Sequence, residues 1–95
     1  MLSREELIEK IKELCKIYDF PYRELSFTKF NGERINKIKI EKIRNNFDFV
    51  KINIIVKEKS LLMRIETEGS ISNGFHTTYA LLNRLWRILS LKSED

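Results

Sequence analysis

Few side chains in this sequence have the types and spacing that catalysis requires. Cys15 and His76 are the single cysteine and the single histidine. Cys15 falls on the apolar stripe of a predicted helix, and only Lys12 and Lys16 lie at helical spacing to favour a thiolate. We therefore predict a packing role for Cys15. His76 is expected in the first turn of a second helix, where a surface or capping role is favoured over that of a general base.

The acidic residues also lack a catalytic arrangement. Glu66 and Glu68 point to one face of a predicted strand, a spacing that a metal site can use, but no third convergent ligand is apparent. The chain contains no E-x-K pair of the nuclease type, no G-x-x-x-x-G-K loop, no G-x-S-x-G elbow and no H-E-x-x-H helix. We predict that the protein is not an enzyme and has no catalytic residues, no metal and no cofactor.

Length and composition predict one folded α+β domain spanning residues 1–95. Hydrophobic residues make up 42% of the chain and charged residues 34%, with a net charge of +4 that permits an anionic partner without requiring one. A single cysteine excludes an intrachain disulfide. The charged N-terminal segment does not resemble a signal peptide, and no apolar run approaches the ~18 residues of a membrane span. We expect an intracellular, cytoplasmic protein without a membrane partner.

The composition also has a thermophilic character. Glutamine is absent and alanine occurs once, whereas Ile, Lys, Glu and Arg are abundant. In length and composition the chain resembles small uncharacterised proteins of crenarchaeal viruses. No motif carries this resemblance, and it implies no function.

Hydrophobic periodicity predicts two helices and four strands. Ser3 and Glu6 form a capping box before an apolar stripe that ends ahead of Pro21. A period of two indicates four strands, and a second helical pattern follows the loop SISNG. The strands are expected at about 22–30, 33–44, 47–57 and 60–68, and the second helix at about 76–91. The predicted fold is a two-layer α-β-β-β-β-α domain, in which a four-stranded antiparallel meander carries both helices on one face.

Turn lengths set the expected register. A two-residue turn at Asn31-Gly32 would place Leu25 opposite Ile38. A bulge at residues 41–42 would return Ile43 to the core face and set Ile40 opposite Val50. In the last hairpin, Lys57 opposite Ser60 gives apolar pairs throughout. The predicted core face consists of Leu25, Phe27, Ile38, Ile40, Ile43, Val50, Ile52, Ile54, Val56, Leu61, Met63 and Ile65.

The opposite face of the sheet mixes basic, acidic and apolar residues, and it is too apolar for a surface that meets only water. We therefore predict a contact surface on this face. The predicted contact residues are Tyr22, Lys37, Phe47, Phe49, Lys51, Ile55, Leu62 and Arg64. The expected partner is a second copy of the chain, in a homodimer, or another protein, bound through this face or through the edge of the fourth strand.

The alternative partner is single-stranded nucleic acid, with bases stacked on Phe47 and Phe49 and with Lys51 and Arg64 on phosphates. The segment NNFDFVKI, residues 45–52, resembles the aromatic strand of RNA-recognition domains. It departs from that pattern because Asn45-Asn46 replaces the basic-glycine pair and Ile52 replaces the last aromatic residue. That family has a helix between its first two strands, and none is predicted here. The same segment also fits an ordinary β-strand.

Overall fold

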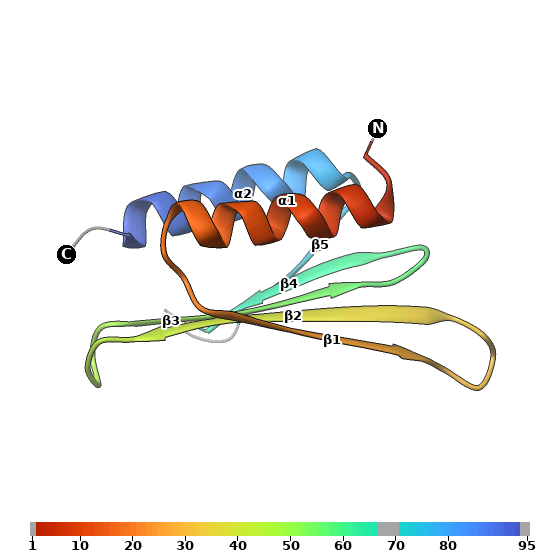
Figure 1. The fold of residues 1–95 in the computed structure, drawn as a ribbon, viewed down its shortest axis with the longest axis horizontal. Helices are drawn as coiled ribbons and strands as arrows, with labels where there is room; N and C mark the ends of the chain where they lie inside the picture. Colours follow the sequence, from red (N-terminus) through yellow and green to blue (C-terminus); the bar gives the residue numbers. More distant parts are fainter. Residues whose placement is uncertain (1, 67–70, 94–95) are drawn as a thin grey trace.

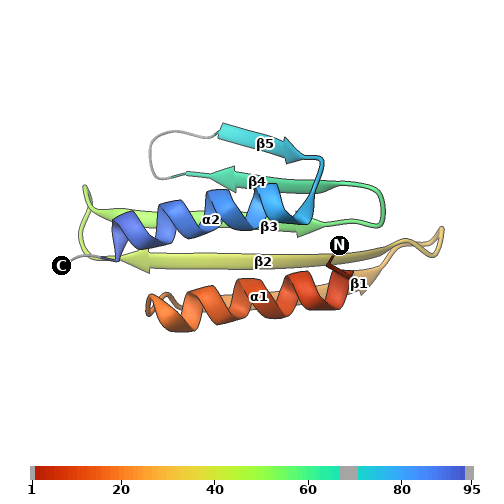
Figure 2. The same ribbon diagram turned by 90° about the horizontal axis from the view of Figure 1, so that it is seen from above.

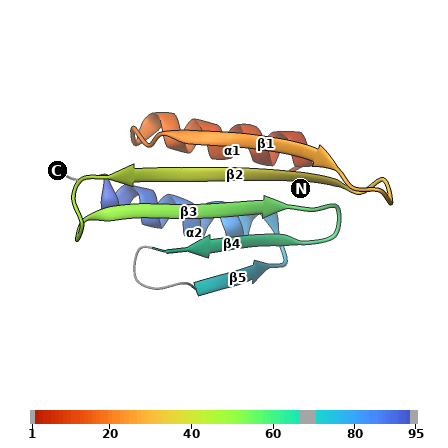
Figure 3. The same cartoon turned by 90° about the horizontal axis from the view of Figure 1, so that it is seen from below.

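A computed structural model describes residues 2–66 and 71–93 of the chain. Five antiparallel strands pair in the order in which they follow along the chain, and two helices lie side by side on one face of the sheet (Figures 1 and 2). Both helices run in the same direction (Figure 1). Figure 3 shows the opposite face of the sheet in front, with both helices behind it. The elements are α1 (Arg4–Ile17), β1 (Tyr22–Thr28), β2 (Arg34–Ile43), β3 (Phe49–Val56), β4 (Leu61–Ile65), β5 (Ile71–Phe75) and α2 (Thr78–Lys92).

The α+β class and the two-helix layer confirm the prediction, but the described residues contain one strand more than predicted. Residues 71–75 form β5, with Phe75 opposite Leu61 and Gly74 opposite Leu62, although residues 71–74 were expected in the loop SISNG. The composition of this segment does not indicate a strand. The strand forms because its backbone pairs with the N–H and C=O groups on the open edge of β4. The predicted interaction through a fourth-strand edge is therefore wrong. The edge strands are β1 and β5.

The core lies between the helices and the sheet. Side chains four positions apart on each helix point to the sheet, as expected for an amphipathic stripe. α1 contributes Leu7, Ile8, Ile11 and Cys15, and α2 contributes Leu81, Leu85 and Leu89. The sheet contributes Ile38, Ile40, Val50, Ile52, Ile54, Val56, Met63 and Ile65, and Phe20 joins them from the α1–β1 connection.

Local capping signals fix where both helices begin. The predicted capping box is confirmed: Glu6 N donates to Ser3 Oγ and Ser3 N donates to Glu6 Oε1, both at 3.1 Å. α2 begins two residues later than predicted, because Thr77 is the N-cap and its Oγ1 accepts from Ala80 N at 3.0 Å. His76 precedes this cap and is exposed.

The predicted register of the β3–β4 hairpin is confirmed. Lys57 N donates to Ser60 O at 2.9 Å, and the pairs that follow join Val56 with Leu61 and Ile54 with Met63. The register holds because an apolar side chain on one strand meets an apolar side chain on the other at every inward position. Of the predicted fourth strand, residues 67–68 lie outside the described residues.

The predicted register between β1 and β2 is wrong by one residue. The hairpin loop has three residues rather than two: Lys29 N donates to Glu33 O, and Gly32 N donates to Lys29 O, both at 2.9 Å. Gly32 adopts φ +85°, the left-handed conformation that a three-residue hairpin loop with a bulge requires. Leu25 consequently pairs with Lys37 instead of Ile38.

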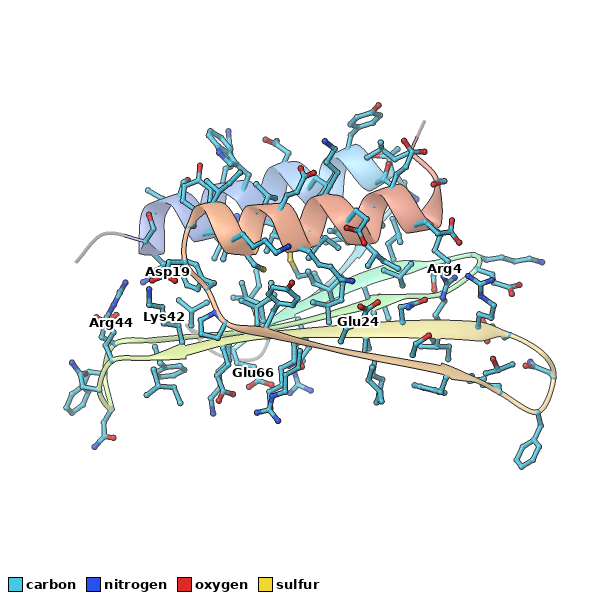
Figure 4. All side chains as sticks on the ribbon, in the orientation of Figure 1. Arg4, Asp19, Glu24, Lys42, Arg44 and Glu66 are labelled. Atoms are coloured by element: carbon cyan, nitrogen blue, oxygen red, sulfur yellow. The ribbon has the colours of Figure 1, made fainter. Side chains whose placement is uncertain are left out.

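This slip exchanges the two faces of β1, because side chains alternate along a strand. Leu25 and Phe27, predicted in the core, lie on the face away from the helices and are 59% and 39% exposed. Glu24 lies on the helix side, where its Oε1 is 2.7 Å from Lys12 Nζ (Figure 4). Helix α1 thus supplies a cation for a carboxylate that faces inward.

The predicted bulge in β2 is absent. Pairing runs without interruption from Asn36 opposite Val56 to Ile43 opposite Phe49, so Ile43 faces outward and is 57% exposed. Ile40 pairs with Ile52, two residues from the predicted partner, and a shift of two keeps it on the predicted face. Lys42 takes the inward position that was predicted for Ile43.

Two cations anchor the connection between the helix layer and the sheet. Lys42 Nζ donates to Asp19 O at 3.0 Å and lies 5.0 Å from the Phe20 ring centroid (Figure 4). Arg4 Nε donates to Oδ1 of the buried Asn36 at 2.9 Å, and its Nη2 donates to Val56 O at 3.0 Å. These bonds satisfy polar groups that would otherwise be costly to bury.

Candidate functional site

The face of the sheet opposite the helices is not covered by a helix, and we call it the outer face (Figure 3). Strand alternation places every second residue there. Side chains that share a row across the strands are neighbours, because paired positions on adjacent strands lie about 5 Å apart. The rows therefore show which residues cluster.

Two adjacent rows at one end of the outer face form a cluster of five apolar residues, which we call the outer patch. In the first row Phe27 pairs with Ile35. In the second row Leu25 pairs with Lys37, Lys37 with Ile55, and Ile55 with Leu62. Ile35 is only 3% exposed although it faces away from the helices. The outer patch consists of Leu25, Phe27, Ile35, Ile55 and Leu62.

The next row is cationic. Arg23, Lys39, Asn53 and Arg64 pair in sequence across four strands, and we call them the cationic row. Lys39 Nζ is 3.6 Å from Glu41, and Arg64 Nε is 3.8 Å from Glu66, so carboxylates partly neutralise two of its three cations. The strand positions and Glu66 together place five basic and two acidic side chains on the outer face. The basic residues are Arg23, Lys37, Lys39, Lys51 and Arg64, and the acidic residues are Glu41 and Glu66.

The far end of the outer face carries a smaller apolar pair. Ile43 lies opposite Phe49, and Lys51 Nζ is 6.0 Å from the Phe49 ring centroid. Phe47 is beyond this pair, in the turn between β2 and β3, and is 97% exposed. About six residues separate Phe49 from Ile55 along β3, which corresponds to roughly 20 Å. The smaller pair is therefore separate from the outer patch.

A hollow of about 280 Å³ lies where the outer patch meets the cationic row. Its apolar part includes Ile55 and Leu62, which are paired across β3 and β4 and are each only partly buried. Its polar part includes Lys37 from β2, Asn53 from β3 and Arg64 from β4. The hollow therefore offers an aliphatic surface with one cation beside it on β2 and another on β4.

Six of the eight predicted contact residues lie on the outer face. Lys37, Ile55, Leu62 and Arg64 line the hollow, while Phe49 and Lys51 lie at the far end. The two exceptions are Tyr22, which lies on the helix side and packs against the core, and Phe47, which lies in a turn. Because Phe47 is outside β3, the structure does not form the predicted row of two aromatic residues on one strand.

Sequence reasoning missed Leu25 and Phe27, the most exposed members of the outer patch. It assigned both to the core because a two-residue turn at Asn31-Gly32 placed Leu25 opposite Ile38, and Phe27 shares the face of Leu25. The missed signal is Gly32, which also satisfies the bulge position of a three-residue loop. With a three-residue loop, the side chains of β1 that were predicted to face the core face outward instead.

Among the described residues, those considered for catalysis form no metal-binding cluster and no reactive thiol. Cys15 is fully buried, and its burial raises the pKa of the thiol to about 11, so the thiolate is scarce at neutral pH. Glu66 pairs with Arg64, and Glu68 lies outside the described residues. Within residues 2–66 and 71–93, no three His, Cys, Asp or Glu side chains are placed to hold a metal ion. None of the helices in this part of the chain has the length and apolar character to cross a membrane.

Comparison of the chain with protein-family models, with curated proteins and with solved structures found no match.

Proposed function

We propose that the protein is a non-enzymatic binding module that recognises a protein partner, either a second copy or a different chain, through the outer face of its sheet. The observation that carries this proposal is the outer patch. Leu25 and Phe27 on β1 remain 59% and 39% exposed, and the partly buried Ile55 and Leu62 lie on the same face beyond Lys37. Apolar side chains gathered on one open face are typical of a protein interface.

The helix layer is a weaker candidate for the same role. Its most exposed aliphatic residues, Ile17 and Leu91, are the last and the penultimate residue of their helices, 69% and 76% exposed. Trp86 is partly exposed, but its Nε1 already donates to Tyr18 Oη at 2.8 Å within the protein. The outer patch, in contrast, gathers apolar residues from four strands, with Lys37 between Leu25 and Ile55.

Site-directed photo-cross-linking tests the proposal. The photoreactive residue p-benzoylphenylalanine replaces Leu25 or Phe27 in the test proteins and Ile17 or Leu91 in the matched controls. All four positions are exposed, so circular dichroism should show an unchanged fold. We expect ultraviolet irradiation of the purified protein, or of native extract, to give protein adducts from the outer-face positions only. Adducts from the helix positions alone would refute the proposal.

A second candidate function is the binding of single-stranded nucleic acid, which the excess of cations on the outer face favours. Lys37 and Lys51 each lie over a phenylalanine ring, at 5.7 and 6.0 Å from the centroid, and neither has a carboxylate within 4 Å among the described residues. Binding of a fluorescent oligo(dT) should then weaken steeply as salt rises. Lys51→Gln should weaken binding more than Arg84→Gln on the exposed part of α2. Equal effects would indicate unspecific charge attraction.

A further inference from the structure

The hollow between β2 and β4 combines two features that specify the chemistry of a ligand. Ile55 and Leu62 lie opposite each other and present a partly exposed aliphatic surface. Lys37 on β2 lies next to Ile55, and Arg64 lies two residues beyond Leu62 on β4. A group that fills the hollow therefore meets the methyl groups of Ile55 and Leu62 and a positive charge on two of its sides.

Both cations are available to an incoming carboxylate. Lys37 Nζ has no carboxylate within 4 Å among the described residues and rests over the Phe27 ring, 5.7 Å from its centroid. Arg64 makes only an exposed ion pair with Glu66, at 3.8 Å and with half of the Arg64 side chain in solvent. Such surface pairs contribute little, so exchange of Glu66 for another carboxylate costs little.

The spacing of the cations indicates how far apart two acidic groups should lie. Lys37 and Arg64 belong to strands two apart and to adjacent rows, which separates their backbones by roughly 10 Å across the sheet and roughly 7 Å along it. An extended peptide advances about 3.3 Å per residue and its side chains alternate between two faces, so acidic residues four positions apart lie roughly 13 Å from each other on the same face. An aliphatic residue midway between them would face the hollow.

Charge and surface type select among the other occupants. Stacking two copies face to face would oppose two surfaces that each carry five basic and two acidic side chains, which is unfavourable. Nucleic acid bases bind best to aromatic rings, whereas the hollow is aliphatic. An acidic protein segment with an aliphatic centre satisfies both requirements.

We propose that the hollow lined by Lys37, Asn53, Ile55, Leu62 and Arg64 is a docking site for a protein segment in which acidic residues flank two aliphatic residues. The proposal rests on the proposed function, since it names the partner of the same face. Carboxylates of the segment pair with Lys37 and Arg64, and the aliphatic side chain on the same face of the segment covers Ile55 and Leu62.

Methyl and amide NMR on the full chain tests this with defined peptides. The probe is the acetylated and amidated peptide EDLLED, compared with its neutral counterpart QNLLQN and with EDSSED, which lacks the aliphatic centre. We expect EDLLED to shift the methyl signals of Ile55 and Leu62 and to bind at least tenfold more tightly than either control peptide. Raising the salt from 0.05 to 0.3 M should weaken the binding of EDLLED and leave that of QNLLQN unchanged.

Matched protein variants locate the charge effect. Lys37→Gln and Arg64→Gln should each weaken EDLLED binding about three- to tenfold, as loss of one partner of a charge pair at an interface does. Arg84→Gln removes the same charge from the exposed part of α2 and should have no effect. All three positions are exposed, so the fold is retained, as circular dichroism would show.

Four results would overturn the inference, and they separate it from the proposed function. If cross-linking gives protein adducts at Leu25 but EDLLED binds no better than QNLLQN, the acidic chemistry is wrong and the outer face remains an interface. If the peptides shift only helix residues, both proposals fail. If oligo(dT) shifts Ile55 and Leu62 more strongly than EDLLED, the occupant is nucleic acid. If these methyl signals move with protein concentration alone, the occupant is a second copy.

Discussion

Replacing one residue on each face of the sheet by alanine tests the register of β1. In the register predicted from the sequence, Leu25 and Ile38 are opposite each other in the core and should cost similar stability when truncated. In the structure Ile38 is fully buried and Leu25 is 59% exposed. The two registers therefore predict different ratios for Leu25→Ala and Ile38→Ala.

The magnitudes follow from burial. Truncating a fully buried isoleucine to alanine lowers the free energy of unfolding by about 2–5 kcal/mol, because contacts are lost and a cavity is left. Burying a leucine completely is worth about 1.5–3 kcal/mol, and Leu25 retains less than half of that burial and faces solvent. We expect Leu25→Ala to cost about 0.5–1 kcal/mol. Any loss of β-propensity is common to both variants, since both positions are in strands.

Urea unfolding followed by circular dichroism and by the fluorescence of Trp86 measures both costs. For a domain of this size, a difference of about 2 kcal/mol separates the two midpoints by on the order of 1 M urea. Equal midpoints for Leu25→Ala and Ile38→Ala would show that Leu25 is buried in the core and would refute the register described above. That result would also remove the outer patch on which the proposed function depends.

Three further predictions concern two residues with positive φ and a buried thiol. Asp19 has φ +58° and Gly32 has φ +85°, a left-handed conformation that glycine adopts more easily than other residues. Asp19→Gly should therefore stabilise the protein by about 0.5–1 kcal/mol. Gly32→Ala should destabilise it by about 1 kcal/mol, although no atom lies within 4 Å of the new Cβ. Thermal unfolding measures both, and a Gly32→Ala protein as stable as the parent would contradict the three-residue loop. Burial raises the pKa of Cys15 from 9.0 to about 11, so the folded state keeps a proton that the unfolded state loses. The resulting stabilisation is complete below pH 9 and is lost as the pH rises through 11, where the loss is about 2 kcal/mol. Cys15→Ala should lose less stability than the parent between pH 8 and pH 11, and identical losses would show that the thiol does not contribute.

Much of the fold could be predicted because its signals are local or repeated. The capping box needs only Ser3 and Glu6, which lie within one helical turn. The β3–β4 register was correct because Ile54 and Val56 find apolar partners in only one alignment. The α+β class followed from two amphipathic helices and from strands with one strongly apolar face.

The candidate site was harder to predict because the decisive signals are not local. Leu25 and Phe27 alternate with polar residues and fit either face of β1, so the pattern alone does not orient that strand. β5 has no period-two pattern, and it becomes a strand because the edge of β4 provides hydrogen-bond partners. Lys37, Ile55 and Arg64 were found by pattern, but their common hollow depends on pairing across three strands.

By itself, the sequence determined which segments are helices, most of the strands and the apolar face of β3 and β4, since each of these depends on neighbouring residues or on a long repeated pattern. Only the tertiary structure decided which way β1 faces. The loop at residues 30–32 is one residue longer than the shortest alternative, and α1 places Lys12 where an inward Glu24 can bind it. A change of one residue in a turn reverses every side chain of the strand before it, and here that reversal created the exposed apolar surface.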